Sequence, residues 1–88
     1  MNNYVLIFKT SIRTALERSK LIAKLLYVSK EISKATIDLE DEENILRVES
    51  RYSNQQTIIN TLLQEGYHVD LLAVYGQNKH GLPTLQTI

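Results

Sequence analysis

Side chains that could do chemistry are sparse in this 88-residue chain, and few have the spacing that a site requires. Cysteine is absent, which excludes thiolate metal ligands, thiol nucleophiles and disulfides. The two histidines, His68 and His80, are twelve positions apart and lack the spacing of a ligand pair. We therefore expect His68 to point outward from a strand and His80 to be solvated.

A dense acidic segment between positions 38 and 43 is a second candidate, because carboxylates bind hard cations such as Ca²⁺. The segment lacks the glycine and the alternating ligand spacing of an EF-hand loop. We interpret it as the solvated tip of a hairpin. Its carboxylates belong to Asp38, Glu40, Asp41, Glu42 and Glu43.

Thr14 and Glu17 have the spacing of a capping box, in which two residues at a helix start bind each other's backbone amides. A carboxylate in the first turn also complements the helix dipole. This structural role accounts for both residues. The alternative is that Glu17 is a general acid or a metal ligand.

Ten basic and ten acidic residues give zero net charge, but the two signs are segregated along the chain. Residues 1–36 carry seven basic and two acidic side chains, whereas residues 37–49 carry six acidic and one basic. A nucleic-acid binder usually has a basic excess, so this balance disfavours that class. The segregation indicates a basic face that meets an acidic partner, either another protein or a second copy of this chain.

Hydrophobic periodicity indicates the elements that must position these residues. Residues 4–10 form a continuous run rich in β-branched and aromatic side chains, which is typical of a central strand. A helix is expected from Thr14 to Ile32, because no proline or glycine interrupts the pattern. Its buried face should consist of Leu21, Leu25, Val28 and Ile32, which recur at spacings of four, three and four.

The two following segments, 35–40 and 45–49, alternate apolar and polar side chains. This alternation predicts a hairpin of two half-buried strands. In the second strand, Leu46 and Val48 should point toward the core.

A second helix should begin at a capping box formed by Ser53 and Gln56. Gly66 stands where a left-handed residue ends a helix, and residues 67–75 then form the last strand. The helix should bury Ile58, Ile59, Leu62 and Leu63.

The resulting order predicts an α+β ferredoxin-like βαββαβ sandwich, in which two helices pack on one face of a four-stranded antiparallel sheet. Right-handed crossovers place the first and third strands at its centre. Residues 1–75 should form a single domain, and the turn-rich residues 76–88 a flexible tail.

The segments 8–12, 37–40 and 45–49, with the Gly66–Tyr67 step into the last strand, resemble heavy-metal-associated domains, the copper-chaperone-like ferredoxin sandwiches. The resemblance covers roughly residues 4–73. Members of that family bind a soft metal through a Cys-x-x-Cys pair at the start of the first helix. Thr14 and Glu17 occupy these positions here, and neither is a soft ligand. The resemblance therefore implies the fold and argues against the family's metal binding.

Two other classes share this element order, and the residues disfavour both. An RNA-recognition module needs outward aromatics on its central strands, where Ile45, Arg47 and Glu49 stand instead. An acylphosphatase-like hydrolase needs a glycine-rich phosphate cradle around an arginine. Arg13 follows the first strand, but no glycine is near it.

The first helix also carries apolar residues on the side opposite its core stripe. A few exposed apolar side chains are ordinary, but a group of them indicates a contact surface. We therefore predict a protein interface on this side, most simply with a second copy of the chain. Its residues are Leu16, Ala23, Leu26 and Tyr27.

These patterns predict a non-catalytic interaction or regulatory module that has lost a thiolate metal site, needs no cofactor and binds a protein partner or itself. The alternatives are a metal-ion-binding protein with oxygen or nitrogen ligands, and a small-ligand-sensing dimer. No secretion signal and no stretch of ~20 apolar residues is evident, so we expect a cytoplasmic protein that contacts neither membrane nor nucleic acid.

Overall fold

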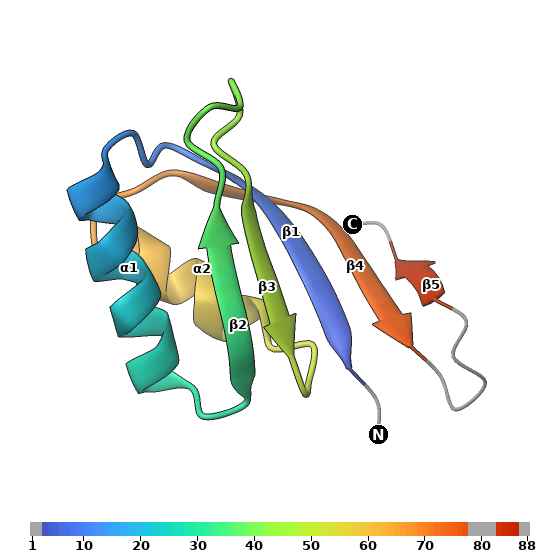
Figure 1. Cartoon of the computed structure of the whole chain (residues 1–88). Helices are drawn as coiled ribbons and strands as arrows, with labels where there is room; N and C mark the ends of the chain where they lie inside the picture. Colours follow the sequence, from blue (N-terminus) through green and yellow to red (C-terminus); the bar gives the residue numbers. More distant parts are fainter. Residues whose placement is uncertain (1–2, 78–82, 87–88) are drawn as a thin grey trace.

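The computed structural model describes residues 3–77 and 83–86, which form one antiparallel sheet and two helices (Figure 1). The five strands lie in the order β2-β3-β1-β4-β5. Along the chain the elements are β1 (Tyr4–Thr10), α1 (Ala15–Val28), β2 (Ile32–Ile37), β3 (Leu46–Ser50), α2 (Gln55–Gln64), β4 (Val69–Gln77) and β5 (Pro83–Gln86).

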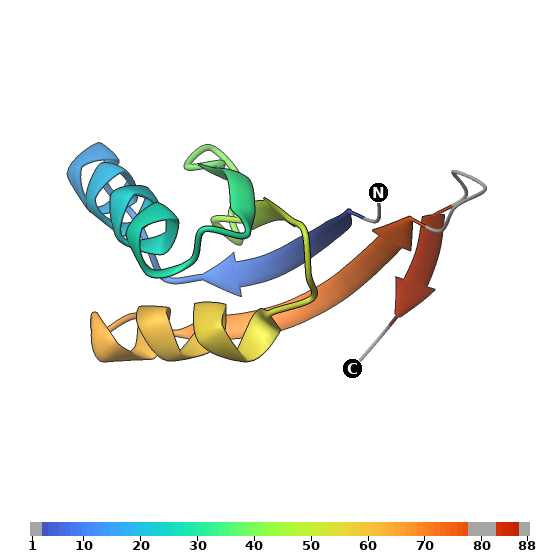
Figure 2. The same cartoon turned by 90° about the horizontal axis from the view of Figure 1, so that it is seen from below.

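Both helices lie on the same side of the sheet, so the molecule has one helical layer and one sheet layer (Figure 2). The first six elements follow the order βαββαβ, and β1 and β3 are the inner strands of the first four. The predicted α+β ferredoxin-like fold is therefore confirmed. Neither described helix has the length and apolar character that a membrane crossing requires.

The core lies between the helices and the inner face of the sheet. Alternate residues of β1 and β3 point into it, as the sequence pattern predicts for β3. Burying each large aliphatic or aromatic side chain stabilises the fold by about 1.5–3 kcal/mol. The side chains that are almost completely buried include Leu6, Phe8, Leu21, Leu25, Leu46, Val48, Ile58, Leu62 and Val74.

The first helix is shorter than its periodicity predicts. It ends at Val28, and the amide of the next residue, Ser29, donates to the carbonyl of Leu25 at 3.1 Å. Ile32 is buried from β2, where it pairs with Ser50 of β3, and Val28 is 41% exposed. Of the predicted stripe, only Leu21 and Leu25 are therefore buried as part of the helix. Strand β2 begins earlier than expected. The pairing with β3 decides this boundary.

The start of α2 also differs from the prediction, because Ser53 and Gln56 do not form a capping box. Asn54 is the N-cap, and its side chain makes no capping hydrogen bond. Its amide group instead accepts from Ser50 Oγ at 3.1 Å and donates to Ser29 Oγ at 3.0 Å. Both serines are buried, and buried hydroxyls require hydrogen-bond partners.

The end of α2 is a Schellman turn, as Gly66 predicts. Gly66 has φ +88°, and the amides of Gly66 and Tyr67 donate to the carbonyls of Leu63 and Leu62, both at 3.0 Å. Leu62 is fully buried, but Leu63 is 55% exposed, contrary to the prediction. The buried neighbour of Leu62 is Thr61, which is 5% exposed, so the core side of α2 lies along Ile58, Thr61 and Leu62 and leaves Leu63 on the solvent side.

The last part of the chain adds a strand that the sequence pattern does not predict. β4 begins and ends two residues later than expected, and residues 83–86 of the predicted flexible tail form β5. β5 pairs antiparallel with β4, from Val74 opposite Gln86 to Gln77 opposite Pro83. The rest of the predicted tail beyond β4, residues 78–82 and 87–88, lies outside the described residues.

Candidate functional site

Thr14 and Glu17, the two residues of the predicted capping box, lie at the start of α1: Thr14 is the N-cap and Glu17 is in the first turn. Thr14 Oγ1 accepts from the amide of Glu17 at 3.1 Å. Glu17 Oε1 in turn accepts from the amides of Thr14 and Arg13, each at 3.1 Å. The predicted capping box is thus present. Its hydrogen bonds to the helix start account for both residues.

These hydrogen bonds also change the acidity of the site. The backbone amides of Arg13 and Thr14 stabilise the carboxylate and hold the pKa of Glu17 below its usual value. Partial burial, and then the negative charge of Glu17, raise the pKa of the Tyr67 hydroxyl. A general acid at neutral pH needs a raised carboxyl pKa, so the shift at Glu17 is opposite to the one that this role requires.

The remaining sequence candidates do not converge. His68 is exposed and lies one residue before β4, whereas His80 is outside the described residues. The acidic residues of the segment 38–43 are exposed in the β2–β3 turn, where two aspartates accept hydrogen bonds from amides two residues further on. Within residues 3–77 and 83–86, no three His, Asp or Glu side chains lie together as metal ligands.

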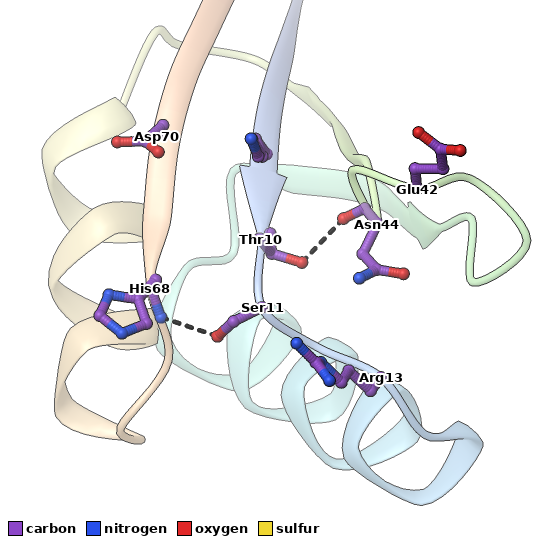
Figure 3. Close-up of a pocket in the computed structure, with 8 residues that line it drawn as sticks. Thr10, Ser11, Arg13, Glu42, Asn44, His68 and Asp70 are labelled. Carbon is purple, nitrogen blue, oxygen red and sulfur yellow. Dashed lines mark hydrogen bonds between the residues drawn. The ribbon is translucent and has the colours of Figure 1, made fainter.

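A polar cavity of about 220 Å³ lies at this end of the sheet, between the end of β1, the β2–β3 turn and the start of β4 (Figure 3). Thr10 Oγ1 donates to the carbonyl of Asn44 at 2.7 Å, and Ser11 Oγ accepts from the amide of His68 at 2.9 Å. These bonds hold the walls together. The charged groups have both signs, so the cavity suits a small hydrated solute better than an apolar ligand. It is lined by Lys9, Thr10, Ser11, Arg13, Glu42, Asn44, His68 and Asp70.

This cavity is not evident from the sequence. Its residues come from three short segments, 9–13, 42–44 and 68–70, which only the pairing of the strands brings together. The one signal in the sequence is that polar residues gather where strands end.

The outer face of α1, in contrast, is expected from the sequence. The four predicted interface residues are all exposed, with Tyr27 84% exposed. Leu21 and Leu25, in contrast, face the core from the same helix. The helix forms because leucine, alanine and lysine all favour it, so its outer residues are not needed to hold the core. The exposed apolar side chains are Leu16, Ala23, Leu26 and Tyr27.

The charges around this face are almost all positive. Lys20 and Lys24 are exposed within the helix, and Arg13 and Lys30 are exposed at its two ends. The only acidic residue of α1 is Glu17, whose carboxylate is bound to the backbone at the helix start. The two ion pairs in the described part of the chain lie elsewhere, on the sheet and its turn. The outer face of α1 therefore combines apolar residues with basic residues among and beside them.

Neither a scan of the chain against protein-family models nor a search of curated proteins finds a match.

Proposed function

We propose that this chain is a non-catalytic protein-interaction module, similar to a heavy-metal-associated domain without the thiolate site, and that it binds its partner along the outer face of α1. The observation that supports this proposal is the spacing of the exposed residues. Leu16, Lys20, Ala23 and Tyr27 follow the pattern i, i+4, i+7, i+11. At about 100° per residue, all four point within roughly 60° of one direction. They form a straight stripe about 16 Å long.

This stripe has the form of a helix–helix contact. A second helix packs against residues that repeat every three and four positions. Leu16, Ala23 and Tyr27 are the apolar members of this repeat, and Lys20 is its charged member. Ala23 lets a partner helix approach closely, and Tyr27 supplies a large rigid side chain of the kind that dominates binding energy. The partner that fits is an amphipathic helix whose apolar side lies along the stripe.

The charge of the face selects among such partners. Lys20 lies in the stripe, and Lys24 lies beside it. A second copy of α1 would bring the same cations together, which disfavours the self-pairing that the sequence alone favours as the simplest case. Glutamate or aspartate at the borders of the partner helix would instead meet these lysines. We therefore assign the face to an acidic amphipathic helix of another protein.

The test uses two synthetic helical peptides of about 18 residues that share one leucine seam. One carries glutamate at the positions bordering the seam, and the other carries lysine. Each is titrated into the ¹⁵N-labelled chain. We expect the glutamate peptide to bind at least tenfold more tightly and to shift amide signals along α1. Replacing both lysines, Lys20→Glu and Lys24→Glu, should reverse the preference.

Lys34→Glu is the matched control, because it makes the same charge change on an exposed residue of β2 on the other side of the sheet. It should leave the preference for the glutamate peptide in place. Equal affinity for the two peptides, no binding of either, or signal shifts confined to another face would each contradict the proposal.

A competition titration distinguishes this function from metal binding. Cu(I), Zn(II) and Ni(II) are offered to the purified chain with a chromophoric chelator of micromolar affinity at neutral pH. We expect the chelator to keep all three metals. Capture of one equivalent would favour the alternative with oxygen or nitrogen ligands, and Glu17 and His68 would then be the residues to replace.

A further inference from the structure

The face of the sheet turned away from the helices is unusually apolar at its centre. The outward residues in the middle of β1 are Val5 and Ile7, which alternate with the buried Leu6 and Phe8, and the exposed Lys9 follows them on the same face. An antiparallel sheet that covers a core with one face normally carries polar residues on the other. A strand that is apolar on both faces is typical of a sheet covered on both sides. In the described part of the chain, helices cover only one side (Figure 2).

Strand β4 extends this apolar surface next to β1. Its outward residues Ala73 and Tyr75 pair with Ile7 and Val5, and Leu72 lies at the bulge beside them. Leu72 is 41% exposed and Tyr75 38% exposed. The result is an apolar stripe across two neighbouring strands.

The residues of β3 add charges of both signs at one border of the stripe. Arg47 pairs with Ile7, and Glu49 pairs with Val5. Arg47 Nη1 lies 2.6 Å from Glu49 Oε2, and both side chains remain partly exposed. Lys34 of β2 lies beside Glu49, and Lys9 and Asp70 pair at the far end of β1 and β4. The open face therefore has charges of both signs around its apolar residues, whereas the charges around the outer face of α1 are basic.

The register arranges these side chains in two rows across the sheet. One row reads Glu49–Val5–Tyr75, and the next reads Arg47–Ile7–Ala73. The rows differ by two residues along each strand, so both point to the same face. On β3, β1 and β4, each member of one row has a complement in the other: acid against base, valine against isoleucine, and a large ring against a small methyl group. On β2, Lys34 continues the first row and Thr36 the second.

We propose that two copies of this chain pack their open sheet faces together around a two-fold axis that runs across the strands between the two rows. This axis places each row of one copy over the other row of its partner. Glu49 then meets the partner's Arg47, and Tyr75 fills the space over the partner's Ala73. The interface is isologous, as in most homodimers, and twisted sheets pack face to face at about −30° with their strands nearly aligned.

The size of the face sets the strength of this dimer. Five strands about 4.8 Å apart and about six residues long make a face of roughly 24 by 20 Å. Two such faces bury on the order of 1,000 Å², which is near the lower limit for a specific interface. The dimer should therefore dissociate in the micromolar range or above. The zero net charge of the chain means that two copies do not repel one another as a whole.

This inference concerns a different surface from the proposed function and does not depend on it. The helices lie on the other side of the sheet, so the dimer leaves both copies of the outer face of α1 exposed (Figure 2). A partner with two acidic helices would then bind with higher avidity than a partner with one.

The test is analytical ultracentrifugation of the whole chain from about 5 μM to about 1 mM. We expect a monomer–dimer equilibrium, and we expect Arg47→Glu and Glu49→Arg each to raise the dissociation constant at least tenfold. In each single variant, like charges face one another across the axis. Both residues are at the surface, so circular dichroism should show that the variants fold normally.

An equimolar mixture of the two single variants isolates the contact between copies. The Arg47→Glu chain carries two carboxylates at these positions, and the Glu49→Arg chain carries two guanidinium groups. Neither can form the pair within itself, so only contact between the chains restores it. We expect the mixture to form heterodimers at least tenfold more tightly than either variant forms homodimers.

Lys20→Glu is the matched control, because it reverses a charge on the outer face of α1. It should leave the dissociation constant unchanged, and a change would assign self-association to α1 instead. A native chain that remains monomeric to about 1 mM would overturn the proposal. A mixture that associates no better than its components would overturn it as well.

Discussion

The neighbours Leu25 and Leu26 test directly which side of α1 stabilises the fold and which side is free to bind. Leu25 is fully buried in the core, whereas Leu26 is 43% exposed on the outer side of the helix. Leucine and alanine both favour helices, so replacing either with alanine changes the intrinsic helix propensity little. The two substitutions remove the same atoms from the same turn, and only their surroundings differ.

The magnitude follows from these surroundings. Leu25→Ala loses the transfer free energy of the removed groups and leaves a cavity, which together cost about 3–5 kcal/mol at a fully buried site. Leu26→Ala opens no enclosed cavity and should cost less than about 1 kcal/mol. The whole chain has a stability of roughly 4–13 kcal/mol, at ~0.05–0.15 kcal/mol per residue. Leu25→Ala can therefore remove much of the free energy of unfolding of the chain.

Urea unfolding followed by circular dichroism measures both costs. With a slope of about 1 kcal/mol per molar urea, a loss of 3 kcal/mol lowers the midpoint by about 3 M. If Leu25→Ala does not fold, Leu25→Val gives a measurable intermediate loss of about 1–1.5 kcal/mol. Equal losses at the two positions would refute the reasoning, because the outer side of α1 would then hold the fold together and would not be free for a partner.

Three further predictions concern the ends of the helices. Glu17→Gln removes a carboxylate whose pKa is lowered by backbone amides, so it should destabilise the chain at pH 7. The difference in stability between the variant and the native chain should shrink as the pH falls through the lowered pKa, because the native carboxylate then becomes protonated. A difference between urea midpoints that is the same near pH 7 and pH 3 would contradict this. Gly66→Ala places a side chain at a residue with φ +88°, where no atom lies within 4 Å of the added Cβ. Backbone strain alone should therefore lower the free energy of unfolding by about 1–2 kcal/mol, measured by urea unfolding. A neutral result would show that the turn relaxes. Asn54→Ala removes the amide group that Ser29 and Ser50 bind, and it should lower the free energy of unfolding by about 1–3 kcal/mol. The control Asn60→Ala loses only an exposed hydrogen bond to Gln56 and should cost less than about 0.5 kcal/mol.

The correct predictions of caps, turns and strand faces share a physical basis, which is that they depend on neighbours along the chain. The capping box joins Thr14 to a residue three positions away, and the turn at Gly66 closes within six residues. The inward alternation of Leu46 and Val48 follows from the two-residue period of a strand. Local hydrogen bonds and local periods are visible in sequence because no distant segment is needed to complete them.

Three of the wrong predictions involve a distant contact. Ile32 fits the helical period of the residues before it, but it joins β2 because β3 pairs with it. Asn54 gives up its capping bond because two buried serines, one of them 25 residues away, need its amide group. Strand β5 follows a turn-rich segment, and its four residues have no sequence pattern typical of a strand. Only its pairing with β4 identifies it as one. Long-range pairing decided all three.

The two candidate surfaces differ in the same respect, because one depends on local periodicity and the other on long-range strand pairing. The sequence by itself determined the outer face of α1, because the helical period assigns one side to the core and leaves Leu16, Ala23 and Tyr27 on the other. Only the tertiary structure decided the two complementary rows on the open sheet face. Val5 meets Glu49 and Tyr75 through the register of β1 with strands more than 40 residues away, and a shift by one residue would turn these side chains to the core. A surface within one helix is local, whereas a surface across a sheet exists only when the strands have paired.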